Sequence, residues 1–202
     1  MFRKMRIAPR MALLIAVGAG AILGLVVGYN YFSARRLLED ELRLKARYLA
    51  QATACRIEVV EHAVEKVVQA AVYMLEETER PVPQRYAILE ALVSGNKEIF
   101  GAAIAPWPRN TAPYVWRDQT SSNGLARSDL SAEGYRYEVW DWFTLPRDLK
   151  RAIWTEPYFD EGGGDVMMVT RAAPFHHPCL ANDFAGVITS DVSLEWLRDM
   201  LA

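Results

Sequence analysis

The chain has 202 residues, a hydrophobic content of 51% and a formal net charge of −2, which suits one packed domain with an appendage. The near-neutral balance gives no sign of a nucleic-acid-binding protein, because such proteins carry a basic excess. Two cysteines, Cys55 and Cys179, form neither a disulfide framework nor a metal-ligand set, and we interpret both as unpaired thiols of undefined role.

An uncharged apolar segment near the N-terminus predicts a single transmembrane helix. Residues 11–34 carry no charged side chain, and about 20 apolar residues cross a bilayer. We place the span at 11–32, after a cytoplasmic basic tail at 1–10. By the positive-inside rule, the remainder lies outside the inner membrane, in the periplasmic or extracellular space. The alternative is a cleaved signal peptide, but Phe32-Ser33-Ala34 fits the cleavage pattern poorly.

Three glycines recur every four residues within the span, at Gly20, Gly24 and Gly28. Small residues at this spacing let two membrane helices approach closely, which predicts a dimerising anchor. Glycine is also common in membrane helices generally, so a purely compositional explanation stays open.

A long amphipathic helix is predicted at residues 33–80, continuous with the span. The segment lacks proline and glycine until Pro81, which is typical of an uninterrupted helix. Its apolar residues follow a helical spacing of threes and fours. They are Leu38, Leu42, Leu49, Ile57, Val60, Val64, Val67, Ala71 and Leu75. We expect its lower part to pair with the same helix of a second copy in a homodimer, and its upper part to pack on the domain.

Residues 81–202 predict an α+β module with an antiparallel sheet and helices on one face. The alternating and apolar runs indicate short strands, and the amphipathic runs indicate short helices. In chain order we expect a helix at 85–94, strands at 99–105 and 114–117, a polar loop at 118–134, a helical turn at 140–143, strands at 166–172 and 184–192, and a helix from 194.

The stretch WTEPYFDEGGGD, residues 154–165, permits three readings. A catalytic site is disfavoured because no nucleophile or histidine accompanies its acids. A calcium loop is disfavoured because the alternating acids and terminal glutamate of an EF-hand are missing. We favour a pocket wall, in which Gly162–Gly164 turn tightly and aim Tyr158 and Asp160 inward. A zinc site at His176, His177 and Cys179 is likewise disfavoured against a surface loop.

Two motifs carry a resemblance to a known family. The stretches DWF…WTEPYFDEGGG and GVITSDVSLEWL are similar to the extracytoplasmic Cache sensor domains of bacterial transmembrane receptors. The chain looks most like the membrane-distal, PAS-like module of double Cache domains, particularly those fused to PP2C-type phosphatases or histidine kinases. The resemblance implies a membrane anchor, a long helix and a PAS-like antiparallel sheet.

The resemblance also implies a ligand pocket, because many members that bind amino acids or amines share a signature. Carried onto this sequence, it falls on Tyr135, Trp142, Phe143, Tyr158, Asp160 and Asp191. Where the family has the arginine that grips a ligand carboxylate, this chain has Trp140. Phe143 also lacks the hydroxyl of the usual tyrosine. The acids that would meet an ammonium group are therefore present, whereas the carboxylate clamp is not.

We expect the pocket floor to include Met168 or Met167, and Thr170. Aromatic faces with carboxylates hold small cations well, while tryptophan cannot supply the fork that a carboxylate prefers. The expected ligand is therefore a small cationic or neutral metabolite that is not a standard amino acid. The competing explanations are structural, with Asp160 capping the glycine turn and Asp191 capping a helix near Ser193.

The sequence thus predicts a non-enzymatic sensing module with a small-molecule ligand and no cofactor, metal or nucleic-acid partner. Two alternatives belong to other classes. One is a dimerising membrane anchor whose domain binds nothing, and the other is an extracytoplasmic enzyme.

Overall fold

The computed structural model describes residues 7–132, 134–161, 164–177 and 180–201. The chain forms two compact units, one ending at Ala54 and the other beginning at Cys55. Helix α1 (Ile7–Glu77) contributes to both. The predicted continuous helix is therefore confirmed, although it ends at Glu77 and so before the two prolines that follow.

The first unit consists of the N-terminal part of α1, and its large apolar side chains are exposed. An 18-residue window of this helix has a mean hydropathy of 2.5. By length and composition it is able to cross a membrane, which is what the uncharged segment predicts. Leu38, Leu42 and Leu49, which belong to the expected apolar stripe, are also exposed.

The C-terminal part of α1 belongs to the second unit, and one of its faces is buried. Val64, Val68, Ala71, Val72 and Leu75 are all at most 6% exposed. Their spacing of three and four residues puts them on one helical face. This face rests on the sheet, so the helix that leaves the first unit also forms part of the domain core.

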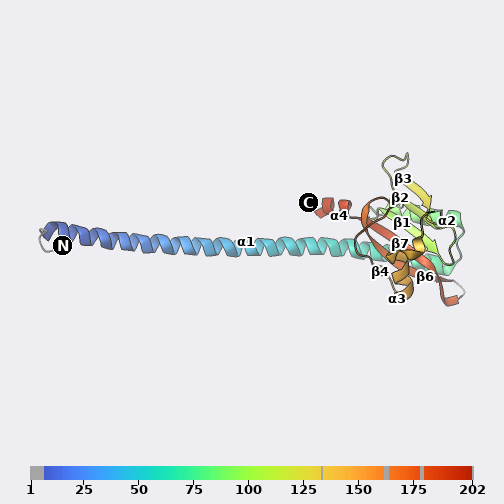
Figure 1. The fold of residues 1–202 in the computed structure, drawn as a ribbon, viewed down its shortest axis with the longest axis horizontal. Coiled ribbons are helices and arrows are strands. Elements are labelled where there is room, and N and C mark those ends of the chain that lie inside the picture. Colours follow the sequence, from blue (N-terminus) through green and yellow to red (C-terminus); the bar gives the residue numbers. More distant parts are fainter. Residues whose placement is uncertain (1–6, 133, 162–163, 178–179, 202) are drawn as a thin grey trace. The chain divides into compact units, whose positions relative to one another are not determined.

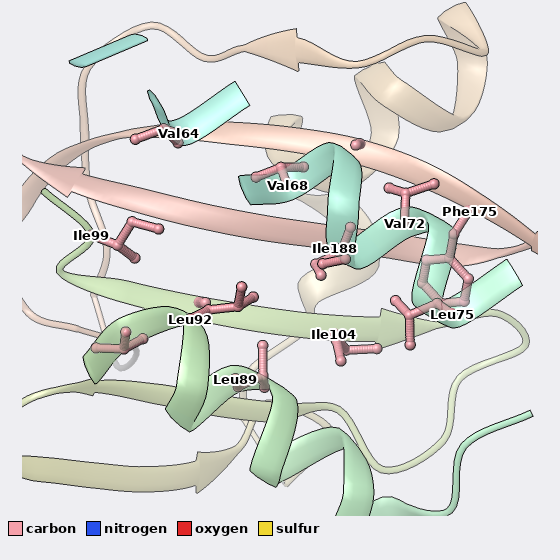
Figure 2. Packing of buried hydrophobic residues seen from close by; sticks show 14 of the residues in the cluster. Val64, Val68, Val72, Leu75, Leu89, Leu92, Ile99, Ile104, Phe175 and Ile188 are labelled. Atoms are coloured by element: carbon pink, nitrogen blue, oxygen red, sulfur yellow. The ribbon is translucent and has the colours of Figure 1, made fainter. Parts of the chain in front are cut away.

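Helix α2 (Val82–Gly95) covers the same face of the sheet. Pro81 precedes it with φ −65°, and prolines at the helix start leave no intrahelical hydrogen bond unmade. Its buried side chains include Leu89 and Leu92. Figure 2 shows these two residues converging with those of α1 around Ile104 and Ile188 of the sheet.

Within the described residues, the sheet contains seven strands, and each of their pairings is antiparallel. Its order is β3-β2-β1-β7-β6-β4, with β5 pairing to β6. Figure 1 labels all of these strands except β5, together with α2, α3 and α4. The strands are β1 (Gly101–Pro106), β2 (Pro113–Arg117), β3 (Leu125–Asp129), β4 (Ile153–Trp154), β5 (Tyr158–Phe159), β6 (Met167–His177) and β7 (Leu180–Ser193).

The expected polar loop at 118–134 is wrong in its middle, where β3 forms. Strand β3 pairs with β2 from Arg117–Leu125 to Pro113–Asp129. It lies at the edge of the sheet, and most of its side chains are only half buried. An edge strand needs no continuous apolar face, because the ladder hydrogen bonds come from its neighbour. The short strands β4 and β5 form for the same reason.

The second face of the sheet is covered too, which corrects the expectation of helices on one face only. Along β1, Ala102 and Ile104 face α1 and α2, while Ala103 and Ala105 face the other side. That other side packs against η1 (Tyr137–Val139) and α3 (Asp141–Leu149). The amphipathic helix α4 (Leu194–Leu201) ends the described chain.

Helix α3 continues through Pro146, where the sequence predicts only a turn ending before this proline. Trp142, Phe143 and Pro146 are buried on one face of the helix. Burial of this face stabilises the extra turn against the loss of one backbone donor at proline. The helix ends at Leu149, and the next residue, Lys150, adopts a left-handed φ of 54°.

A single glycine sets the irregular end of the β6–β7 pairing. Gly186 has φ +151°, and it pairs with both Phe175 and Pro106. A Cβ at this position would lie 2.3 Å from the carbonyl oxygen of Ala105 and 2.8 Å from the ring of Phe175. Only glycine fits this conformation and this close approach together.

Gly186→Ala should therefore destabilise the domain by about 1–3 kcal/mol, from backbone strain and the forced contact. Thermal unfolding of the detergent-solubilised chain, followed by circular dichroism, measures the change. Gly95→Ala is the matched control, since nothing lies within 4 Å of the added methyl group. Equal melting temperatures for Gly186→Ala and the wild type would contradict this account.

Candidate ligand-binding site

Asp160 and Asp191 lie in one buried cluster although they come from different strands. Asp160 follows β5, and Asp191 lies in β7 opposite Thr170 of β6. Their exposed fractions are only 4% and 3%. The two carboxyl groups are near enough for the charge of Asp160 to act on Asp191. The sheet register thus creates a pair of buried acids, which proteins rarely tolerate without a functional use.

Three hydroxyl groups hold the acids in place. Thr170 Oγ1 donates to Asp191 Oδ1 at 2.8 Å, and it lies 2.9 Å from the hydroxyl of Tyr158. Because threonine has one hydroxyl proton, Tyr158 is the donor in that second bond. The hydroxyl of Tyr135 donates to Asp160 Oδ1 at 2.8 Å. The result is two neighbouring hydrogen-bonded groups, one joining β5, β6 and β7 through Thr170, and one joining Asp160 to Tyr135 before η1.

Asp160 also organises the glycine loop. Its Oδ2 accepts a hydrogen bond from the backbone of Gly164 at 2.9 Å. Gly162 and Gly163 of the predicted tight turn lie outside the described residues. Asp160 is therefore both a turn-stabilising residue and a member of the acid pair. Asp191 does not cap the last helix, since Ser193 Oγ accepts from the backbone of Trp196 at 3.4 Å.

Burial strongly disfavours the ionised form of Asp191. Loss of hydration, and secondarily the charge of Asp160, raise the pKa of Asp191 to about 8. The hydroxyls of Thr170 and Tyr114 oppose this rise. Burial also raises the pKa of Asp160, although its hydrogen bonds from Gly164 and Tyr135 act in the other direction. A positive charge placed beside this pair would relieve both penalties.

Tyr114 of β2 belongs to this cluster, and sequence reasoning did not identify it. Its side chain is 2% exposed, and its hydroxyl makes no hydrogen bond of normal geometry with the described residues. Burial raises the pKa of the Tyr114 hydroxyl, and the charges of Asp191 and Asp160 raise it further. A Cβ at Gly101 or Gly164 would lie only 2.5 or 2.8 Å from this hydroxyl. The two glycines thus make room for a buried donor beside the acids.

An aromatic wall lies next to the acids. The Trp140 ring stacks on Tyr135, with centroids 6.0 Å apart, and lies 5.9 Å from the Tyr158 ring. Trp140, Trp142 and Tyr158 also line a cavity of about 320 Å³. Tyr158 joins the two parts of the site, because its ring lines the cavity while its hydroxyl reaches Thr170.

Two further carboxylates line this cavity and were not among the expected site residues. They are Asp141, at the start of α3, and Glu156, between β4 and β5. Glu156 belongs to the motif WTEPYFDEGGGD, but the sequence spacing alone does not show that its side chain lines the cavity. The cavity therefore combines aromatic rings with acids, an arrangement suited to a small cation.

The structure places two of the expected residues deeper than a ligand wall. Phe143 is fully buried, and its ring meets those of Tyr137, Trp142 and Phe184 with centroids 5.2, 6.1 and 6.0 Å apart. Met168 is also fully buried, in register with Tyr158. Both support the aromatic residues from behind. The hydroxyl of Tyr137 donates to the Pro106 carbonyl at 2.8 Å, and this bond ties the aromatic cluster around Phe143 to the end of β1.

No group of three or more metal-ligating side chains is found among the described residues. His176 instead bonds to Glu76 of α1, with Nδ1 and Oε1 2.9 Å apart. Cys55 is a free, exposed thiol on α1, while Cys179 lies outside the described residues.

Residues 85–199 match the family model of methyl-accepting chemotaxis protein-like domains, first PDC sensor domain. This match covers more than half of the chain. The chain belongs to this family of PDC sensor domains. The resemblance to extracytoplasmic sensors of the PAS-like type is thereby confirmed, and the second unit is a PDC domain. No protein of curated function matches the chain.

Solved structures of the same fold come from two receptor classes. The extracellular domain of a histidine kinase, soHK1S-Z6, is 28% identical with a TM-score of 0.61, and the match covers 74% of this chain and 59% of that one. The ligand-binding domain of the Pseudomonas aeruginosa PAO1 amino acid chemoreceptor PctC, in complex with GABA, is 20% identical with a TM-score of 0.57. That match covers 76% of this chain and 64% of that one.

A third neighbour is the sensory domain of the Campylobacter jejuni chemoreceptor Tlp3 with isoleucine bound. It is 11% identical with a TM-score of 0.57, and the match covers 76% of this chain and 60% of that one. The PDC chain described here thus spans about three fifths of the length of these sensor domains.

The raised pKa of Asp191 predicts a pH dependence of stability. Unfolding returns the carboxyl to an ordinary pKa, so the protein without ligand should lose stability as pH rises from about 4 to about 8, by roughly 1 kcal/mol per pH unit. Asp191→Asn removes this titration and should be more stable than the wild type at pH 7.

Melting temperatures at pH 5, 6, 7 and 8 measure this effect. Asp148→Asn is the control, because Asp148 is an exposed acid on α3. It should retain the wild-type dependence on pH. A slope in Asp191→Asn identical to that of the wild type would show that this carboxyl titrates normally.

Proposed function

We propose that this PDC domain is the extracytoplasmic sensing module of a bacterial membrane receptor and that it binds a small cationic metabolite of the amine type. The observation that carries the proposal is the acid pair behind Tyr158, next to a cavity lined by aromatic rings and two further carboxylates. The expected residues Tyr135, Trp140, Trp142, Tyr158, Asp160, Thr170 and Asp191 act at this site.

Charge complementarity favours a cation over an amino acid zwitterion. None of the described residues that line the cavity is basic. Two carboxyl groups buried together are penalised by desolvation and by each other, and an ammonium group offsets both costs. A ligand carboxylate would instead meet the rings of Trp140 and the acids, without the forked donor that it prefers.

Two of the similar solved structures contain ligands that can be compared with the one proposed here. PctC is an amino acid chemoreceptor solved with GABA, and Tlp3 was solved with isoleucine. Both ligands carry a carboxylate. The signature of amino-acid-binding relatives has an arginine where this chain has Trp140, so we infer a ligand that lacks the carboxylate or does not rely on it.

The N-terminal helix supports a membrane-anchored arrangement. The apolar window of α1 follows a basic segment, which favours a cytoplasmic N-terminus and a sensor outside. The exposed apolar residues of α1 between Leu37 and Leu49 favour pairing with a second copy. A homodimer would give the sensor a partner helix against which α1 is able to shift.

A clamp on α1 gives this sensor a route for transmitting the signal. In β6, Thr170 reaches Asp191, while the next residue, Arg171, points to the opposite face of the strand. There Arg171 Nη1 lies 3.1 Å from Glu65 Oε1 of α1. Trp154 Nε1 donates to the same oxygen at 3.3 Å. A ligand that moves β6 at Thr170 therefore also moves Arg171 and its contact with Glu65 of α1.

Such a displacement transmits a signal only if the ligand prefers one of two arrangements of α1. Glu65 suits this role because a half-buried carboxylate with two donors has a defined geometry. A second carboxylate of α1, Glu76, accepts hydrogen bonds from the backbone and ring of His176 at 3.0 and 2.9 Å. The two contacts hold α1 at two points along β6, one at Arg171 and one at His176.

Titration calorimetry of the full chain with a panel of primary and quaternary amines and of the standard amino acids tests the ligand class. We expect an amine to bind, and Asp160→Asn or Asp191→Asn to weaken it by roughly tenfold or more. Asp148→Asn is the matched control and should bind as the wild type does. Trp140→Arg should add affinity for amino acids by supplying the missing fork.

Binding of a standard amino acid whose methyl ester does not bind would overturn the cationic assignment. Failure of every compound in a broad library would favour a scaffold that binds nothing. Turnover of a bound compound would favour an enzyme.

The clamp on α1 has its own test. In a Cys179→Ser background the exposed Cys55 is the sole thiol, so its oxidation reports contact between the α1 helices of two copies. An amine from the panel should change the cross-linking rate in the wild type, and Glu65→Gln should abolish this change while leaving amine binding intact. Glu58→Gln, an exposed neighbour on α1, is the control. An unchanged response in Glu65→Gln would contradict the clamp.

A further inference from the structure

A second pocket lies at the other end of the sheet from the acid pair. Asp191 pairs with Gly101 at the start of β1, whereas this pocket lies by Pro106 at its end, roughly 17 Å further along the strand. It has a volume of about 220 Å³ and is formed by the end of α1, the start of α2, the segment after β1, and β6. None of the described residues that line it also lines the aromatic cavity.

Arginines line this pocket, and two of them are held by backbone carbonyls. Arg85 Nε donates to the carbonyl of Arg80 at 2.8 Å, and Arg80 Nε donates to that of Met74 at 3.4 Å. Among the described residues neither guanidinium forms an ion pair within 4.0 Å. Carbonyls orient a guanidinium without cancelling its charge.

The other charged groups of the pocket are largely compensated. Arg109 Nη1 pairs with Glu138 at 2.7 Å, and His176 pairs with Glu76 at 2.9 Å. Glu79 also lines the pocket and acts on Arg85 from a distance. Burial lowers the pKa of Arg85 in spite of that acid. Among the described residues that line the pocket, Arg80 and Arg85 thus present two cationic groups beside the carboxylate of Glu79.

Apolar side chains also line this pocket. Trp107 is 42% exposed although it is a large hydrophobic side chain, and it lines the pocket beside Pro106 and Phe175. Leu75 of α1 also lines the pocket. A pocket that combines cationic side chains with an exposed indole matches a molecule with an anionic end and an apolar body.

We propose that this pocket is a second ligand site, which binds a small organic carboxylate carrying an apolar or aromatic body. Arg85 and Arg80 take the carboxylate, because a guanidinium binds it through two parallel hydrogen bonds. The apolar body lies against Trp107 and Phe175. The chain then carries two sites of opposite preference, one for a cation and one for an anion, towards opposite ends of the same sheet.

Titration calorimetry of the full chain in detergent, at constant ionic strength, tests this with benzoate as the probe. Acetate, which has the carboxylate without the body, and inorganic phosphate serve as comparators. Benzoate should bind more tightly than both. Arg85→Gln should weaken benzoate binding by roughly tenfold, and Arg85→Lys should weaken it less. Trp107→Ala should reduce the preference for benzoate over acetate.

Arg151→Gln removes an equal charge from an exposed position outside the pocket and should bind benzoate as the wild type does. If Arg85→Gln melts at a lower temperature than the wild type, Arg80→Gln replaces it as the variant that should weaken benzoate binding. The proposal is overturned if benzoate does not bind, if Arg151→Gln weakens it as much as Arg85→Gln, or if phosphate binds as tightly.

Discussion

The antiparallel pairing of β6 with β7 is the constraint on which both the fold and the site depend. It places Thr170 opposite Asp191 and, because side chains alternate, turns Arg171 to the other face. One face then contains the acids, and the other contains the contact to Glu65 of α1. A shift of register by one residue would exchange these faces and remove both features.

The helices that cover both faces of the sheet bury the acid pair, and this burial makes ionisation of the two carboxyl groups unfavourable. Helices α1 and α2 pack on one face, and η1 and α3 on the other, so Asp160 and Asp191 are shielded from water. The same covering positions Tyr135, Trp140 and Tyr158 around them. The hydroxyls of Tyr135 and Thr170 orient the carboxyl groups but supply no positive charge. Desolvation raises the pKa of both carboxyl groups.

Membership in the PDC family defines the scaffold more than the ligand. The chain shares its fold with sensor domains of chemoreceptors and of a histidine kinase, at 28% identity or less in the three structures compared. Specificity on a common fold depends on a few side chains. Here Trp140 lines the cavity together with two acids, Asp141 and Glu156.

The sequence by itself determined the apolar segment, the uninterrupted α1, the antiparallel α+β class and the family. These features depend on local composition, period and motif, which need no knowledge of distant contacts. It also indicated Tyr158, Asp160 and Asp191, through a resemblance that covers the motif around the glycine loop. It did not indicate β3, whose residues lack an apolar pattern because its pairing with β2 stabilises it from the edge.

Only the tertiary structure decided which side chains meet. Tyr114 joins the acids because β2 and β7 flank β1, an arrangement that no spacing along the chain reveals. Phe143 lies in the core, although its neighbour Trp142 lines the cavity, because α3 turns successive residues to different depths. The approach of Arg80 and Arg85 to Trp107 depends likewise on how α2 packs beside β1. Contacts between distant segments are set by packing and burial, and these are properties of the folded chain.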